Sequence, residues 1–309
     1  MPPIPTKNRI RTEDALKHLY DCGYTKRSAS VESVAGALAI PRAEAAELLA
    51  SLQEGNLVKV VSGSFILTGE GIDYALQVIR AHRLYETYLA RESGLSADEW
   101  HSRAHEAEHH LTVKEVDDLA DRLGRPRYDP HGDPIPTRTG HVAEVHALNL
   151  LEWKPGETGV VLHIEDEPAS IFKRIFDTGI FPGMRISVRD KRGQNLSLGV
   201  EGRTVQLPRD AAAQISLGTL SHEDSQRAIP ARLSDLKPGQ MSEVVGLSPH
   251  FRGAERTRLL DLGFVPGSVI TRAFASPLSS PIAYQIRGTL VALREEQAEH
   301  VYMRTINPA

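Results

Sequence analysis

The sequence has 309 residues, of which 6% are aromatic and 25% are charged, as is typical of soluble globular domains rather than disordered chains. Its formal net charge of −4 gives no overall attraction to nucleic acid, so any DNA contact would depend on a local basic face. The single cysteine, Cys22, excludes an internal disulfide framework and a thiolate-rich metal site, so any bound metal must use nitrogen and oxygen ligands.

Residues 12–66 are predicted to form three short helices followed by a β-hairpin. The first helix starts at Thr12, which is suited to capping a helix N-terminus, and the third starts at Pro41, which a first turn tolerates. The hairpin strands are LVKVV and SFIL, joined through a Ser-Gly-Ser turn. This order is the outline of a winged helix-turn-helix, which we place within residues 1–70.

The expected DNA-reading helix offers few side chains that read bases. Its sequence, PRAEAAELLASLQ, contains Arg42 and Ser51 as candidates, together with Glu44 and Glu47, whose charges would repel phosphates. Contacts to the DNA backbone are expected from the basic residues Lys7, Arg9, Arg11, Lys26 and Arg27. The alternative is a degenerate winged helix that serves only for dimerisation.

Residues 71–140 begin with two predicted helices that are rich in histidine and carboxylate. The first runs from about Gly71 to Arg91 and places His82 and Glu86 on one face, because a helix advances about 100° per residue. The second opens after Ser96, an N-cap residue. A third helix, TVKEVDDLADRLG, ends before the proline-rich boundary RYDPHGDPIPTRTG.

One stripe of the second helix, an arc of roughly 100°, carries four candidate metal ligands. They are His101, His105, Glu108 and His109. Glu106 and His110 point elsewhere. Facing His82 and Glu86 on the neighbouring helix, this stripe can enclose one or two divalent cations. Any one of these histidines could instead belong to a solvated polar face, but the placement of all six residues on facing stripes favours a metal site.

Two of these residues have plainer alternatives. Glu86 could pair with Arg83 or Arg91 on its own helix, a surface interaction of small value. Cys22 fits a small buried apolar residue near a helix end.

The second half of the chain contains an internal repeat of about 70 residues. LEWKPGETGVVLHI parallels LSDLKPGQMSEVVGL, FDTGIFPGMRISV parallels LDLGFVPGSVITR, and VEGRTVQLPRDAAAQISL parallels IRGTLVALREEQAEHVYM. The short alternating runs and recurring turn glycines predict two small β-barrels, each with one short helix. We place them at residues 146–222 and 229–309, separated by a linker near SHEDSQRAIP.

The strings ALKHLYDCG, AHRLYETYL, EAEHHLT and GDPIP resemble the diphtheria-toxin-repressor and manganese-transport-repressor family of metal-dependent transcription regulators, over roughly residues 10 to 137. The last 80 residues resemble the FeoA-type SH3-like domain through LSDLKPGQ, RLLDLGFVPGS and PIAYQIRGTLVALREEQAEHV. The first barrel resembles a more diverged copy. The resemblance implies a multidomain α+β chain with a winged helix-turn-helix, an all-α metal-binding and dimerisation domain, and two SH3-like β-barrels in tandem, where a single one is commoner.

The same resemblance implies a repressor that binds double-stranded operator DNA as a homodimer when loaded with Fe²⁺ or Mn²⁺, and that controls metal-uptake genes. Zn²⁺ or Co²⁺ would substitute in vitro. Carried over by position, the primary site would use Asp14, His105, Glu108 and His109, and the ancillary site His82, Glu86 and His101. Glu167, on an acidic loop of the first barrel, would either add an oxygen ligand to the ancillary site or be a solvated loop residue.

Two positions decide which metal is expected. The iron-sensing branch has a methionine where Asp14 stands and a cysteine where His105 stands, whereas the manganese-sensing branch has an aspartate and a glutamate. Because His105 matches neither branch, the sequence does not decide between Fe²⁺ and Mn²⁺ as the bound metal. Asp14 belongs to the first helix of the DNA-binding head and the other primary ligands belong to the dimerisation domain, so a bound metal would tie the two together.

Other functions are weighed against repression. An adaptor that has lost DNA binding is the main alternative, since the FeoA-like ends suit a protein partner and the signature residues of the second barrel are turn formers: Gly263, Pro266, Gly267 and Gly288. A hydrolase is disfavoured because no HExxH, nucleophile elbow or phosphate-cradling glycine loop is present. With no bilayer-spanning apolar run and no signal-peptide core in MPPIPTKNRIRTED, we expect a cytoplasmic protein without a membrane partner and without enzyme activity.

Overall fold

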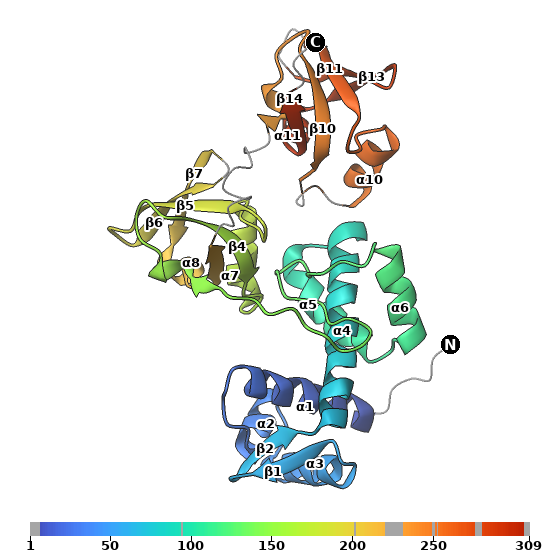
Figure 1. Ribbon diagram of the computed structural model, residues 1–309, viewed down its shortest axis with the longest axis vertical. Coiled ribbons are helices and arrows are strands. Elements are labelled where there is room, and N and C mark those ends of the chain that lie inside the picture. Colours follow the sequence, from blue (N-terminus) through green and yellow to red (C-terminus); the bar gives the residue numbers. More distant parts are fainter. Residues whose placement is uncertain are drawn as a thin grey trace. The chain divides into compact units, whose positions relative to one another are not determined.

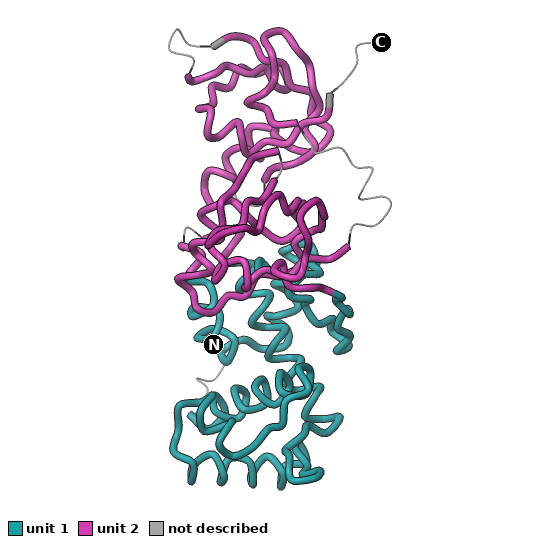
Figure 2. The backbone as a smooth tube through the Cα atoms, turned by 90° about the vertical axis from the view of Figure 1, so that its left-hand side faces the viewer, with its two compact units in different colours: residues 1–89, 99–146 teal, residues 90–98, 147–309 magenta. Residues whose placement is uncertain are grey.

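The computed structural model describes residues 7–93, 95–200, 202–219, 231–248, 251, 253–275 and 280–305. The chain divides into two compact units, residues 1–89 with 99–146 and residues 90–98 with 147–309 (Figure 2). No helix within the described ranges is long and apolar enough to cross a membrane. The multidomain α+β fold predicted from the sequence is confirmed, whereas the predicted linker near SHEDSQRAIP lies outside the described residues.

The first unit opens with a winged helix-turn-helix (Figure 1). Its elements are α1 (Lys7–Tyr24), α2 (Val31–Ala37), α3 (Arg42–Glu54), β1 (Val58–Val61) and β2 (Ser64–Leu67). The two strands pair antiparallel, and Ser30 and Ser33 form a reciprocal cap at the start of α2. Leu16 of α1 and Leu49 of α3 are almost fully buried in the core that holds these elements together.

The expected start of the first helix at Thr12 is wrong, because α1 already begins at Lys7. Thr12 therefore lies inside the helix rather than at its N-cap. The polar residues that precede Thr12 are compatible with a helix, and Arg9 bonds to Glu13 one turn later, which stabilises the additional turn.

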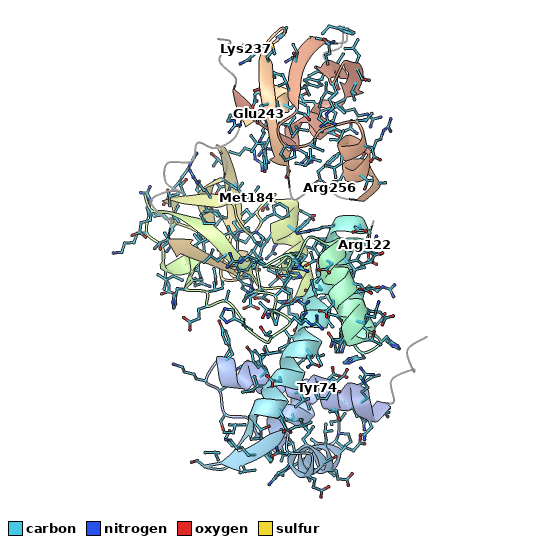
Figure 3. All side chains as sticks on the ribbon, turned by 45° about the vertical axis from the view of Figure 1, so that its right-hand side comes forward. Tyr74, Arg122, Met184, Lys237, Glu243 and Arg256 are labelled. Carbon is cyan, nitrogen blue, oxygen red and sulfur yellow. The ribbon has the colours of Figure 1, made fainter. Side chains whose placement is uncertain are left out.

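The remaining helices of this unit are α4 (Gly69–Glu92), α5 (Ala97–Glu108) and α6 (Val113–Arg122). Near its start α4 belongs to the core of the winged helix-turn-helix, where Ala75 is buried and Tyr74 packs (Figure 3). Farther along, Ala81 and Leu84 of α4 belong to a separate core with residues of α6. The long helix expected from about Gly71 to Arg91 is confirmed by α4. This one continuous helix contributes to both cores.

The second unit contains two antiparallel sheets with the same strand order. The first copy consists of β3 (Leu148–Asn149), the 3₁₀ turn η1 (Leu150–Glu152), β4 (Thr158–Ile164), α7 (Ala169–Asp177), β5 (Arg185–Asp190), β6 (Asn195–Val200), β7 (Arg203–Pro208), α8 (Arg209–Ala212) and β8 (Ile215–Thr219). The second consists of β9 (Ala231–Arg232), η2 (Leu233–Asp235), β10 (Met241–Leu247), α10 (Gly253–Asp261), β11 (Val269–Ala275), β12 (Ile282–Ile286), β13 (Thr289–Leu293), α11 (Glu295–Glu299) and β14 (Val301–Thr305).

The strand orders β3-β8-β4-β5-β6-β7 and β9-β14-β10-β11-β12-β13 match element by element, as the sequence repeat predicts. Each copy carries two α-helices in its described residues, so the expectation of one short helix per barrel is wrong. The short α8 and α11 escaped the sequence reasoning because four or five residues show too little periodicity to mark a helix.

The junction between the wing and α4 generates a stability prediction. A Cβ atom added at Gly71 would lie 2.0 Å from the backbone oxygen of Leu57. Because this neighbour is backbone, the clash cannot be removed by rotating a side chain. We expect Gly71→Ala to destabilise the metal-free protein by about 3 kcal/mol. Urea unfolding followed by far-ultraviolet circular dichroism measures this. The control is Gly36→Ala, where no heavy atom lies within 4 Å and the change should stay within about 1 kcal/mol; equal effects of the two variants would contradict the account.

Candidate metal centre

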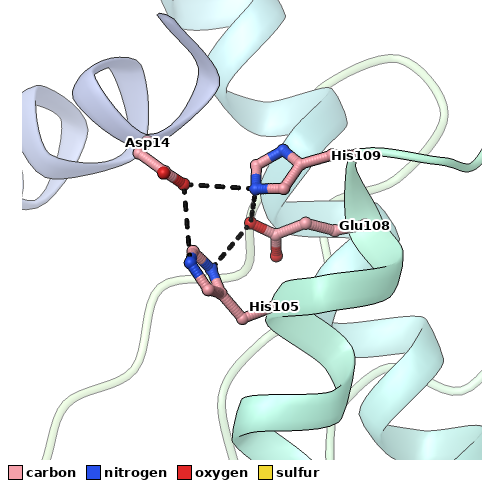
Figure 4. Close-up of side chains that lie close together, drawn as sticks. All are labelled: Asp14, His105, Glu108 and His109. Carbon is pink, nitrogen blue, oxygen red and sulfur yellow. Dashed lines mark ion pairs between the residues drawn. The ribbon is translucent and has the colours of Figure 1, made fainter. Parts of the chain in front are cut away.

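Four side chains from two parts of the first unit converge on one point: Asp14 of α1, and His105, Glu108 and His109 at the end of α5 (Figure 4). One ligand atom from each lies within 4.8 Å of all the others. Asp14 Oδ1 is 3.3 Å from His109 Nε2 and 3.9 Å from His105 Nε2. Glu108 Oε1 is 3.3 Å from His105 Nδ1 and 3.5 Å from His109 Nε2. The structure therefore brings together the residues expected for the primary site.

The chemistry of this cluster fits a divalent metal ion. Asp14 Oδ1 and His109 Nε2 are buried atoms for which no hydrogen-bond partner is found among the described residues. Buried polar atoms are costly without partners, and an ion between them would satisfy both. The donor set contains two imidazoles and two carboxylates and no sulfur, a composition that suits Mn²⁺, Fe²⁺, Co²⁺ or Zn²⁺.

Glu13, which the sequence analysis missed, orients His109. The Nδ1 of His109 lies 2.6 Å from Glu13 Oε2, while Arg9 Nε and the Tyr74 hydroxyl donate to Glu13 Oε1 at 2.7 and 2.8 Å. Burial opposes the charge of Glu13, but the hydrogen bonds from His109, Arg9 and Tyr74 outweigh it and lower its pKa. A carboxylate at Nδ1 leaves Nε2 directed at the cluster, which is how outer carboxylates orient metal-binding histidines. In the sequence nothing marks Glu13 as part of a metal site, because its spacing from Arg9 predicts only an ordinary i, i+4 ion pair.

A second cluster contains the three residues expected for the ancillary site. Glu86 Oε1 lies 3.0 Å from His82 Nε2 and 3.2 Å from His101 Nδ1, and the two histidine nitrogens are 3.3 Å apart. His131, from the proline-rich segment, places its Nε2 3.6 Å from the same Glu86 oxygen. In the sequence this segment has the composition of a domain boundary and carries part of the family resemblance, and the signal for His131 is a histidine between turn residues. His82, Glu86 and His131 are buried, so this cluster is also closed to solvent on most sides.

Glu108 of the primary cluster is also hydrogen-bonded to a member of the ancillary cluster. Its Oε1 faces the primary cluster, and its Oε2 makes a short hydrogen bond with Nδ1 of His82, whose Nε2 belongs to the ancillary cluster. Lys17 Nζ donates to both oxygens, at 2.8 and 2.9 Å. Burial opposes ionisation of Glu108, but hydrogen bonds from His105 and His82 and the charge of Lys17 hold its pKa well below the usual range. The carboxylate is therefore ionised at neutral pH and available to a cation.

The residues expected to contact DNA lie in the winged helix-turn-helix. Three arginines pair with carboxylates of the same head: Arg9 with Glu13 at 2.7 Å, Arg11 with Glu44 at 2.6 Å, and Arg42 with Glu32 at 2.8 Å. Lys7 is the first residue of α1, Lys26 and Arg27 follow its end, and Ser51 is exposed on α3. The pairing of Glu44 with Arg11 neutralises one of the two carboxylates that were expected to repel phosphates.

Glu167, expected as a further oxygen ligand, lies exposed in the loop between β4 and α7 of the second unit. Its role as a ligand stays a prediction. Cys22 is buried, which confirms the expectation of a small buried apolar residue, and burial raises the pKa of its thiol.

Comparisons with known proteins agree with this architecture. A family model described as iron dependent repressor, metal binding and dimerisation domain matches residues 68–137, and the FeoA domain model matches residues 148–217 and 231–305. The iron-dependent repressor IdeR of Mycobacterium leprae is 26% identical over 186 residues, which cover 55% of this chain and 80% of that protein. A probable metal transport system membrane protein of Chlamydia trachomatis is 40% identical over 83 residues, 27% of this chain but only 18% of that protein.

Solved structures show the same likeness. A manganese-dependent transcriptional repressor in complex with manganese is 31% identical, with a TM-score of 0.61, and the match covers 68% of this chain and 100% of that one. The structure of ScaR with bound Cd²⁺ is 27% identical, with a TM-score of 0.56, and covers 68% of this chain and 99% of that one.

The contact between Glu13 and His109 predicts a loss of metal affinity when the carboxylate is changed. In Glu13→Gln the amide can donate to His109 Nδ1, which places the ring proton on the nitrogen that faces the cluster. We expect the Kd for Mn²⁺ to rise by about 10- to 100-fold. Competition with a fluorescent chelator measures it. Glu106→Gln, on the exposed side of the same helix region, is the matched control, and an unchanged Kd in Glu13→Gln would refute the positioning role.

The environment of His109 predicts a pH dependence for the metal-free protein. Burial disfavours its charge, but the nearby carboxylate of Asp14, the hydrogen bond to Glu13 and the charge of Glu108 raise its pKa from 6.5 to about 9. A pKa raised by folding adds stability that is full below pH 6.5 and is lost as the pH rises through about 9. This contribution is at most about 3 kcal/mol. Urea unfolding with a chelator present, on both sides of that window, should show the loss, and His109→Gln should flatten it; a stability that rises over the window would contradict the assignment.

Proposed function

Because the chain belongs to the family of metal-dependent repressors that carry FeoA domains, we propose that it represses transcription by binding operator DNA as a homodimer when it holds Fe²⁺ or Mn²⁺. The genes under its control would be those of metal uptake and homeostasis. This proposal assigns residues 1–70 to DNA binding, residues 71–140 to metal binding and dimerisation, and residues 146–222 and 229–309 to the tandem FeoA-type barrels.

The observation that carries the proposal is the position of Asp14. It lies on α1 of the winged helix-turn-helix, yet its Oδ1 faces His105 and His109, which belong to the helical domain. An ion held by all of these residues fixes α1 relative to α5 and favours whichever orientation of the head brings the ligands together. Metal then stabilises the DNA-competent state by its differential affinity for it.

Within this site the side chains have separate tasks. Asp14 and Glu108 would supply two negative charges to balance the ion, and His105 and His109 would supply neutral nitrogen ligands. Glu13 would hold His109 in the tautomer that binds metal, and Glu108 accepts a hydrogen bond from His82 of the ancillary cluster. The bound ion would contribute the charge that holds these groups together.

Relatives that respond to iron and to manganese both resemble this chain, so the ligands must decide between the two metals. His105 replaces a harder carboxylate or a softer thiolate with an imidazole, which neither metal strongly prefers. We propose that Fe²⁺ and Mn²⁺ both activate the protein, and that Zn²⁺ or Co²⁺ substitutes in vitro. No catalytic role is proposed, since the relatives are repressors by name.

An adaptor without DNA binding is the second candidate. The observation that favours it is that Arg42 and Arg11 are paired with Glu32 and Glu44 of the same head, which leaves them less available to DNA. In that case the FeoA-type barrels would carry the function by binding a protein partner.

Chromatin enrichment across the genome of the source cell separates the two candidates. With metal in excess we expect discrete enriched sites for the wild-type protein, and we expect Asp14→Ala to lose at least about tenfold of that enrichment because the head is no longer tied to α5. Glu106→Ala, an exposed residue of α5, is the control and should keep the wild-type sites. Absence of metal-dependent sites in the wild type would overturn repression, and full enrichment of Asp14→Ala would overturn the coupling through α1.

A further inference from the structure

Lys17 places an ammonium group on Glu108, the carboxylate that links the primary cluster to His82 of the ancillary cluster. Its Nζ lies 2.8 Å from Oε1 and 2.9 Å from Oε2 of Glu108. The side chain of Glu108 is 0% exposed and that of Lys17 is 20% exposed, so the pair is largely withdrawn from water. Lys17 follows Asp14 by three residues on α1, so the two side chains leave the same face of that helix and approach the same end of α5.

The Lys17 ammonium is bound to an oxygen that a metal ion in the primary cluster would need as a ligand. Glu108 Oε1 is the oxygen that faces His105 and His109, and it is the Glu108 oxygen that a metal in the primary cluster would take. With Lys17 at 2.8 Å from that same oxygen, an incoming divalent ion meets a positive charge that is already bound. Two cations on one poorly hydrated carboxylate repel each other, because little water is present to screen them.

We propose that Lys17 is an internal counter-cation that competes with metal for Glu108, stabilising the metal-free site and setting its metal affinity below the value that the ligands alone would give. This inference rests on the proposed metal-dependent function and concerns the metal concentration at which the protein becomes loaded. Loading then becomes an exchange, in which the ion displaces the ammonium from Oε1 of Glu108. Because Lys17 and Asp14 share α1, the exchange replaces one link between α1 and α5 by another.

The exchange can be distinguished from a purely structural role by its sign. If Lys17 only anchored α1 to α5, removing its charge would loosen the cluster and weaken metal binding. If Lys17 competes with the ion, removing its charge takes away the ammonium bound to Glu108 Oε1, and metal binds more tightly. The metal-free protein, in contrast, loses stability in both cases, because a buried carboxylate loses one of the groups that balance its charge.

The test uses the full-length protein with His101→Ala as background, so that the primary cluster is measured without a complete ancillary site. The Kd for Mn²⁺ is determined by competition with a fluorescent chelator for Lys17→Met, Lys17→Gln and Lys17→Arg. Lys114→Met is the matched control, because Lys114 also pairs with a carboxylate, Asp118 at 2.8 Å, but is 86% exposed on α6.

We expect Lys17→Met and Lys17→Gln to bind Mn²⁺ about tenfold more tightly or better, Lys17→Arg to stay within about threefold of the background, and Lys114→Met to change nothing. The two uncharged variants should also melt at a lower temperature than the background without metal, and at a similar or higher temperature with saturating Mn²⁺. Equal or weaker Mn²⁺ binding by both uncharged variants would overturn the proposal. A wild-type protein that binds no Mn²⁺, Fe²⁺ or Co²⁺ would instead overturn the metal-dependent function on which it rests.

Discussion

Glu108 carries a buried negative charge where α1, α4 and α5 meet, and the neighbouring helices are arranged around the need to balance it. A carboxylate that is 0% exposed is unstable unless cations or hydrogen-bond donors surround it. Lys17 of α1 and His82 of α4 supply them directly, and His105 of α5 faces the same group. Because each partner comes from a different helix, we infer that the balance of this one charge affects the winged helix-turn-helix and both candidate metal clusters.

This arrangement suggests how a single bound ion would influence the orientation of the whole winged helix-turn-helix. The winged helix-turn-helix and the helical domain have separate apolar cores, and α4 contributes to both. The polar contacts between α1 and α5 are therefore the adjustable part of that junction, since they depend on which cation sits beside Glu108. A divalent ion in the primary cluster would take Asp14 as well as Glu108 as ligands, whereas the hydrogen bonds of the Lys17 ammonium within the described residues go to Glu108. The two occupancies thus bias the head differently, as a two-state switch requires.

Much of this organisation could be predicted from the sequence, and the exceptions share a physical cause. The helix periodicity of His82, Glu86, His101 and His105 located the ligand stripes, and the repeat in the second half predicted two sheets of the same topology.

The groups that surround the ligands could not be found in this way. Glu13, Lys17 and His131 contact residues that lie 45 to 96 positions away in the sequence, so no local pattern distinguishes them from ordinary surface residues. The start of α1 was misplaced at Thr12 for a related reason, because a capping residue inside a helix resembles one at its end.

The measurement that tests the central claim most directly is a crystal structure of the full-length protein grown with Mn²⁺ or Fe²⁺, with anomalous scattering recorded at both absorption edges. The account predicts an ion held by Asp14, His105, Glu108 and His109, with the ammonium of Lys17 moved away from Oε1 of Glu108. An ion bound by residues of α5 alone, with Asp14 outside its coordination sphere, would contradict the coupling between metal and the DNA-binding head.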